Sequence, residues 1–223
     1  MKRVVTPELL DRDAGTPAEI NTALADLRRI NRWFGGIGTT SRMVQRIAAT
    51  TGQKRLSLLD VAAASGDVAQ KARERLGRAG VELSITLLDR APSHLRNGLP
   101  KVAGDALALP FRDQSFDVVS CGLFAHHLEP REIVAFVNEG LRVARVAVLI
   151  NDLVRHPVHL ALVYAGLPLF RSHITHHDAP ASVRAAYTRD EMQRMLSQTT
   201  AARVEVAPSP LFRMAAIAWR AHP

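Results

Sequence analysis

The sequence predicts an α/β protein built on a mostly parallel, doubly wound sheet of seven strands. Short apolar runs such as 56–62 and 83–89 alternate with segments of helical spacing. Strands that are apolar throughout are typical of parallel sheets covered by helices on both faces. The last two runs, 203–206 and 214–219, are joined by a short segment with two prolines (208–210) and no helix. This indicates an antiparallel hairpin at the edge of a mixed sheet.

The first 50 residues are expected to be helical. Thr-Pro pairs at 6–7 and 16–17 each place a capping hydroxyl before a proline at the first helical position. Glu19 completes a capping box for the second pair. Apolar residues then keep helical spacing through 20–34 until two glycines stop the run, and a further helix is expected over 40–50.

The remaining elements alternate along the chain. Further strands are predicted at 101–103, 116–121 and 146–150, and helices near Val68 and over 130–141. We expect a single domain over residues 1–223. Its parts are an N-terminal helical cap (1–50), a core (56–155), a helical insertion after the fifth strand (156–198) and terminal strands (202–221).

Composition places the chain among ordinary globular proteins. It is 47% hydrophobic and 22% charged, and its single cysteine, Cys121, cannot form an internal disulfide. The N-terminus lacks the apolar stretch of a signal peptide, and the longest apolar run, 160–170, is too short to cross a bilayer. These features predict a cytoplasmic protein without a membrane span.

The formal net charge of +8 is unevenly distributed. Residues 1–56 carry 10 basic and 5 acidic side chains, residues 57–155 carry 12 of each, and residues 156–223 carry 7 and 4. A basic protein can bind nucleic acid or anionic surfaces. Here the surplus lies outside the neutral core, so it is weak evidence for a polyanionic partner.

Polar and small residues follow four of the predicted strands, where open α/β sheets bind their ligands. The first strand ends in a run of small residues (60–67) that lets a ligand approach the backbone. The second ends in Asp89, where a carboxylate can accept hydrogen bonds from both hydroxyls of a ribose. Asp105 follows the third strand and can accept a hydrogen bond from an exocyclic amine, and 121–127 follow the fourth.

With these residues, the chain resembles the class I S-adenosylmethionine-dependent methyltransferases. It is most similar to the small bacterial type related to quinone-biosynthesis C-methyltransferases and to aromatic or polyketide methyltransferases. The resemblance covers roughly residues 20–220. It implies a Rossmann-like sheet, S-adenosyl-L-methionine as cofactor, contacts from 60–66 to its methionine part, and a methyl-transfer side lined by 121–126. The implied cofactor-binding residues are Asp60, Ala62, Ala64, Ser65, Gly66, Asp89, Arg90, Gly104, Asp105, Ala106, Cys121, His126 and Arg32.

One feature departs from the family pattern. The usual Asp-x-Gly-x-Gly-x-Gly run has Ala62 and Ala64 at its first two glycines and keeps only Gly66. The added methyl groups predict a shifted loop or a reduced cofactor affinity. A dinucleotide-binding Rossmann fold is the nearest competitor, but the chain lacks Gly-x-Gly-x-x-Gly and has the terminal hairpin.

The insertion is the predicted substrate cover. It holds five of the nine histidines. Six of its apolar residues can form one wall of a pocket and can also pack as a core helix against the N-terminal helices: Leu160, Val163, Tyr164, Leu167, Leu169 and Phe170. A phenol must lose its proton before accepting a methyl group, and histidine is the usual base near neutral pH. His177, oriented by Asp178, is the first candidate and His127 the second. A metal site is the alternative reading of the insertion, on His156, His159, His173, His176, His177 and Asp178. The chain has no His-Glu-x-x-His pattern, so no metal is expected.

The leading interpretation is O-methylation of a phenolic or polyketide-like acceptor. C-methylation of a quinone precursor, an RNA or DNA methyltransferase, and a non-catalytic methyltransferase-like protein are the alternatives. An Asn/Asp-Pro-Pro-aromatic run after the fourth strand is absent, and only 5% of residues are aromatic, which argues against nucleic acid. The expected partner is a small aromatic or apolar molecule, and the oligomeric state is not predicted.

Overall fold

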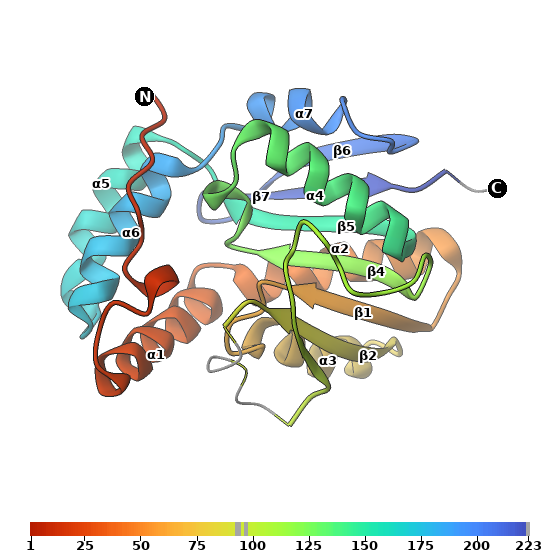
Figure 1. The fold of residues 1–223 in the computed structure, drawn as a ribbon, viewed down its shortest axis with the longest axis horizontal. Coiled ribbons are helices and arrows are strands. Elements are labelled where there is room, and N and C mark those ends of the chain that lie inside the picture. The colour runs from red at the N-terminus through yellow and green to blue at the C-terminus, as the bar shows by residue number, and fades with distance from the viewer. Residues whose placement is uncertain (92–94, 96–97, 222–223) are drawn as a thin grey trace.

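The strands of the computed structural model form one mixed sheet in the order β3-β2-β1-β4-β5-β7-β6 (Figure 1). The structure describes residues 1–91, 95 and 98–221. Strands β1 to β5 pair in parallel, whereas β7 lies antiparallel between β5 and β6. This confirms the predicted fold class. The strands span Arg55–Val61 (β1), Glu82–Asp89 (β2), Lys101–Ala103 (β3), Phe116–Gly122 (β4), Ala144–Leu153 (β5), Arg203–Ser209 (β6) and Arg213–Trp219 (β7).

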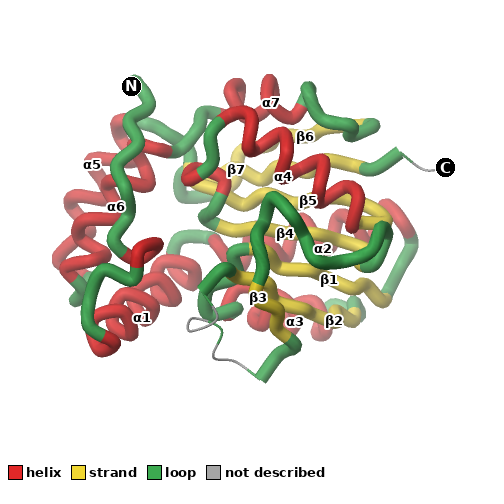
Figure 2. Tube along the Cα trace, viewed as in Figure 1, coloured by secondary structure: helices red, strands yellow, loops and turns green. Residues whose placement is uncertain are grey.

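Helices cover both faces of the sheet, and a further group lies beyond the carboxyl ends of its parallel strands (Figures 1 and 2). One face carries α2 and α3, and the other carries α4 and α7. The group at the strand ends consists of α1, α5 and α6. The helices span Pro17–Trp33 (α1), Gly36–Thr51 (α2), Asp67–Arg78 (α3), Pro130–Val143 (α4), Pro157–Gly166 (α5), His173–Ala185 (α6) and Arg189–Leu196 (α7).

The central strands are apolar throughout because both of their faces are buried. In β1, Leu58 packs into the layer under α2 and α3, while its neighbour Leu59 packs into the layer under α4. Val118 and Val119 of β4 divide in the same way. Alternate side chains of a strand point to opposite faces, so an uninterrupted apolar run is what a covered parallel sheet requires.

The helix start predicted at Thr16 is confirmed by its capping box. The Thr16 hydroxyl accepts a hydrogen bond from the Glu19 amide at 3.4 Å, and the Glu19 carboxylate accepts from the Thr16 amide at 2.8 Å. Thr188 and Glu191 form the same pair at the start of α7, with distances of 3.3 and 2.8 Å. Each box satisfies backbone donors that the first helical turn leaves unpaired.

The prediction that a helix begins at residues 6–7 is wrong. Residues 1–15 form an N-terminal strap with only one 3-10 turn, at Leu10–Arg12, and the strap runs along α6 toward α1 (Figure 1). Some of its backbone donors have distant partners: the Val4 amide donates to the Arg184 carbonyl at 3.1 Å, and the Leu9 and Leu10 amides donate to Asp178. Tertiary contacts therefore replace the local hydrogen bonds that a helix would have made.

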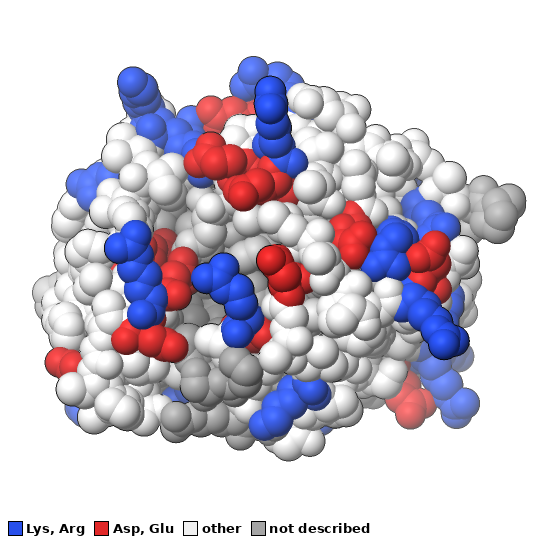
Figure 3. All heavy atoms as spheres, viewed as in Figure 1, with Lys and Arg blue, Asp and Glu red and all other residues white. Residues whose placement is uncertain are grey.

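Charges of both signs are interspersed on the surface. The face drawn in Figure 3 shows basic and acidic side chains beside one another, and many form pairs such as Arg142 with Asp113 at 2.7 Å. No helix in the described ranges is both long and apolar enough to span a membrane.

Candidate active site

A large cavity lies where the parallel strands end. Its volume is about 1070 Å³, and its lining comes from the ends of β1, β2, β4 and β5, from α1, α5 and α6, and from the N-terminal strap. Cavities of this size accommodate cofactors and small-molecule ligands. One half is bordered by the sheet-end acids, and the other by apolar side chains and histidines. We call these the cofactor half and the acceptor half.

The loop after β1 keeps a glycine-type backbone although two of its residues are alanines. Ala62 has φ 53°, Ala64 has φ 46° and Gly66 has φ 66°. The amide of Ala64 donates to Asp89 Oδ2 at 2.8 Å, which holds the loop against the end of β2. Left-handed backbone is costly for residues that carry a Cβ. The backbone of Ala62 and Ala64 is therefore strained, and both residues line the cavity.

Ala62→Gly and Ala64→Gly are each expected to stabilise the protein. Relief of the left-handed strain outweighs the greater unfolded-state entropy of glycine, for a net gain of about 1 kcal/mol. Thermal unfolding would show this as a rise of about 2–4 °C. Ala63 between them has no positive φ, so Ala63→Gly is the matched control and should lower the melting temperature. Destabilisation by both test variants would contradict the prediction.

Asp60 stands at the base of the cofactor half. It is buried, and its carboxylate accepts a hydrogen bond from the Ser120 hydroxyl at 2.7 Å. Burial raises the pKa of Asp60 to about 7, since the Ser120 hydrogen bond offsets only part of the desolvation. Burial also raises the pKa of Asp67, although the Ser65 hydroxyl binds its Oδ1 at 2.9 Å. At neutral pH, Asp60 can therefore offer either a donor or an acceptor to a ligand.

The second and third strand ends place the other predicted acids on the same cavity. Asp89 accepts from Ala64 through Oδ2 and from the Ala91 amide through Oδ1 at 2.9 Å. Each oxygen keeps a further lone pair for a ligand. Asp105 Oδ1 accepts from the Leu107 amide at 2.9 Å. The structure brings these predicted residues together along the cavity: Asp60, Ala62, Ala64, Asp89, Arg90, Gly104, Asp105, Ala106, Cys121 and His126.

Three residues of the predicted cofactor set lie outside this lining. Ser65 and Gly66 are not among the residues that line the cavity, and Arg32 is exposed near the end of α1. Arg28, one turn earlier, is the arginine whose charge acts on the carboxyl of Asp67.

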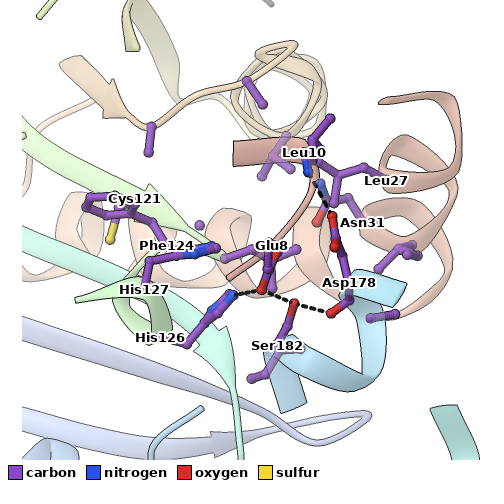
Figure 4. A pocket seen from close by; sticks show the side chains of 18 of the residues that line it. Glu8, Leu10, Leu27, Asn31, Cys121, Phe124, His126, His127, Asp178 and Ser182 are labelled. Atoms are coloured by element: carbon purple, nitrogen blue, oxygen red, sulfur yellow. Dashed lines mark hydrogen bonds and ion pairs between the residues drawn. The ribbon is translucent and has the colours of Figure 1, made fainter. Parts of the chain in front are cut away.

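The acceptor half contains a buried histidine held between two carboxylates. His126 Nδ1 lies 2.7 Å from Asp152 Oδ1. Its Nε2 lies 3.4 Å from Glu8 Oε1, the contact drawn in Figure 4. Burial alone would lower the pKa of His126, but Asp152 and Glu8 raise it to about 10. Glu8 also accepts from the Ser182 hydroxyl at 2.6 Å. In the metal-free chain, the two carboxylates therefore favour the protonated form of this ring.

His127 completes this edge of the cavity. Its Nδ1 lies 2.8 Å from Asp11 Oδ2, and its ring lies beside that of His126 with centroids 4.1 Å apart. Figure 4 shows Glu8, His126, His127 and Ser182 gathered at one side of the pocket. We call Glu8, Asp11, His126 and His127 the acceptor edge. His127, the second predicted base, thus faces the cavity.

The structure does not bring His177 into the cavity. Its side chain is 42% exposed, and its Nδ1 pairs with Asp178 Oδ1 at 2.8 Å. Asp178 lines the cavity, but its two oxygens also accept from the Leu9 and Leu10 amides at 2.9 and 3.0 Å. The predicted pairing exists, yet it anchors the N-terminal strap to α6. Nothing in this geometry supports a catalytic role for His177.

Sequence reasoning missed three carboxylates of the site. Asp152 lies near the carboxyl end of β5. The search for polar residues at strand ends, which identified Asp89 and Asp105, would have found it if extended to the fifth strand. Glu8 and Asp11 come from the N-terminal strap, and no sequence signal marks them. Of the predicted apolar wall, Val163, Leu167, Leu169 and Phe170 line the cavity, whereas Leu160 and Tyr164 do not; Leu162 was missed.

Parts of the chain are similar in sequence to known methyltransferases. Residues 58–146 match the family model described as a methyltransferase domain. A demethylmenaquinone methyltransferase of Roseiflexus sp. (strain RS-1) is 33% identical over 150 residues, which cover 63% of this chain and 56% of the relative. A ubiquinone/menaquinone biosynthesis C-methyltransferase of Roseobacter denitrificans is 34% identical over 116 residues, covering 46% and 42%. The chain spans about half or less of the length of these curated relatives.

Solved structures share the fold at low sequence identity. The plantazolicin methyltransferase BpumL in complex with SAH has a TM-score of 0.69 and 13% identity, covering 96% of this chain and 94% of its own. A SAM-dependent methyltransferase from Aquifex aeolicus has a TM-score of 0.56 and 16% identity, covering 79% and 89%. These likenesses show that the chain has the fold of these solved methyltransferases, and residues 58–146 are the part that matches the methyltransferase domain model.

Proposed function

We propose that this protein transfers a methyl group from S-adenosylmethionine to a small apolar acceptor. The observation that carries the proposal is the single cavity of about 1070 Å³, which joins the acids at the strand ends to an apolar chamber with histidines. When bound, the cofactor supplies an electrophilic methyl group on a positively charged sulfur. The relatives named as methyltransferases support the same reaction class.

The residues of the cofactor half fit such a cofactor. Asp89 offers two oxygens with free lone pairs, which suit the two hydroxyls of a ribose. Asp105 offers an oxygen that can accept from the adenine amine. The loop at 62–64 exposes backbone to the cavity, and Asp60 can donate to or accept from the polar methionine end. Together these residues would bind the cofactor and fix the direction of its methyl group.

The acceptor half favours an aromatic ring that carries a hydroxyl. Leu162, Leu167, Leu169 and Phe170 provide apolar surface, and the acceptor edge provides carboxylates and imidazoles. O-methylation of a phenol is the leading reaction. The quinone methyltransferases among the relatives favour a second candidate, C-methylation of a quinol ring. Both reactions become easier when the hydroxyl loses its proton, so both would use the acceptor edge.

Titration calorimetry with S-adenosylhomocysteine tests the cofactor half. We expect saturable binding by the full chain, and no binding of NAD, which shares adenosine but lacks the methionine part. Transfer of labelled methyl groups to panels of phenols and quinols then tests the acceptor half. The proposal is rejected if the protein does not bind S-adenosylhomocysteine at millimolar ligand concentration.

His127→Asn is expected to reduce kcat by about 100-fold or more, the usual range for a group that handles a proton in the transition state. Its position on the acceptor edge predicts that S-adenosylhomocysteine affinity stays unchanged. His177→Asn is the matched control, because that side chain lies outside the cavity lining. Steady-state kinetics of both variants check the prediction. Equal turnover by His127→Asn and wild type would remove His127 from the site.

A further inference from the structure

Three side chains that commonly bind metal ions converge on the acceptor edge. The ligand atoms of Glu8, His126 and His127 all lie within 4.8 Å of one another. All three residues line the cavity, so an ion between them would keep one side open to a small molecule. They come from the N-terminal strap and from the turn after β4, which are far apart in sequence.

Both histidines are oriented as metal-binding histidines usually are. His126 Nδ1 pairs with Asp152 at 2.7 Å, and His127 Nδ1 pairs with Asp11 at 2.8 Å. A carboxylate on Nδ1 fixes the ring and leaves Nε2 as the coordinating nitrogen. This pattern occurs twice within one small cluster.

The Nε2 atom of His126 is buried without a hydrogen-bond partner among the described residues. His126 is 2% exposed, and its nearest carboxylate oxygen is Glu8 Oε1 at 3.4 Å. That separation is longer than an ordinary hydrogen bond. It matches the edge of a tetrahedron around zinc, which is about 3.3 Å for bonds of about 2.0–2.1 Å. A small rotation of His127, whose side chain is 22% exposed, would bring in the third ligand.

We propose that Glu8, His126 and His127 bind a divalent transition metal, preferably Zn²⁺, and leave its fourth position open to the cavity. The ion would displace the proton from His126 Nε2 into solvent, because only a neutral imidazole coordinates a metal. Two imidazoles, one carboxylate and an open position form a ligand set of catalytic zinc sites. The open position would take the hydroxyl oxygen of the acceptor and ease loss of its proton. This last role rests on the proposed function, whereas metal binding does not.

Zinc titration of the metal-free full chain tests the site. We expect one Zn²⁺ per chain by calorimetry, and Co²⁺ to give the visible absorption of a four- or five-coordinate ion. Loss of a group that only hydrogen-bonds to a metal ligand typically lowers metal affinity by about 10–100-fold, and loss of a ligand itself should cost at least as much. Glu8→Gln and His127→Asn are therefore expected to lower zinc affinity by about 100-fold or more. Asp11→Asn should lower it by about 10-fold. None of these variants removes the buried His126, and urea unfolding of each variant shows whether it is folded.

A surface pair on α6 provides the necessary control. His173 and His177 are four residues apart, and their side chains are 62% and 42% exposed, so they can hold an adventitious ion. His173→Asn combined with His177→Asn should leave the zinc affinity unchanged. The proposal is overturned if the wild type binds no zinc, if this double variant abolishes binding, or if Glu8→Gln and His127→Asn retain it. Failure of S-adenosylhomocysteine binding with zinc binding intact would reject the proposed function alone.

Discussion

Asp89→Ala is expected to weaken S-adenosylhomocysteine binding by about 100-fold or more. Hydrogen bonds to a charged group contribute about 1.5–3 kcal/mol each, and the proposed ribose contact has two of them. The carboxylate also accepts from the Ala64 and Ala91 amides, so its removal loosens the loop that borders the cofactor half. Calorimetry on the purified variant measures the effect.

Asp89→Asn separates the two contributions to this loss. Asparagine keeps one oxygen for the Ala64 amide but gives up an acceptor and the negative charge. An intermediate loss of affinity is therefore expected. Asp190→Ala, an exposed acid at the start of α7, is the matched control and should bind the ligand like the wild type. An unchanged affinity in Asp89→Ala would remove this residue from the cofactor site.

Asp152→Ala is expected to lower the free energy of unfolding by about 3–5 kcal/mol, the usual cost of breaking a buried ion pair. Asp152 accepts from His126 Nδ1 at 2.7 Å and from the His126 amide at 3.1 Å, and both residues are buried. Its loss leaves the imidazolium with Glu8 alone. Urea unfolding measures the change. Asp113→Ala breaks an exposed pair with Arg142 and should cost less than about 1 kcal/mol.

The same pair predicts how wild-type stability depends on pH. The pKa of His126 in the folded protein, about 10, exceeds its ordinary value of 6.5, so the folded state holds the proton more tightly. This contribution is complete below pH 6.5 and is lost as the pH rises toward 10. The pKa of Asp152 is lowered by His126, so its contribution is lost only as the pH falls below 3.8. Unfolding measured from pH 6 to 10 should show a decline that is smaller in Asp152→Ala.

The sheet and the cofactor half follow from local patterns. Apolar runs such as 56–62 predict covered strands because both faces of β1 are buried. The capping box of Thr16 and Glu19 depends on four consecutive residues, so sequence spacing describes it fully. Asp89 was found because the end of a parallel strand has a known position relative to its neighbours.

The acceptor half was not predictable in the same way. Glu8 reaches His126 across more than a hundred residues, and its local sequence resembles a helix start. The adjacency of His177 and Asp178 correctly indicated a hydrogen bond. Successive helical residues point about 100° apart, however, so adjacency could not tell which of the two faces the cavity.

The N-terminal strap gives the two halves of the cavity different local stabilities. Residues 1–7 are largely exposed, and the strap is held mainly by polar contacts, such as those from Leu9 and Leu10 to Asp178 and from Arg3 to Ala185. Segments with few buried apolar contacts open at lower free energy than core strands. Amides of the strap should therefore exchange with solvent well before those of β4. The acceptor half of the cavity should therefore unfold locally first. The cofactor half should stay folded until the sheet unfolds.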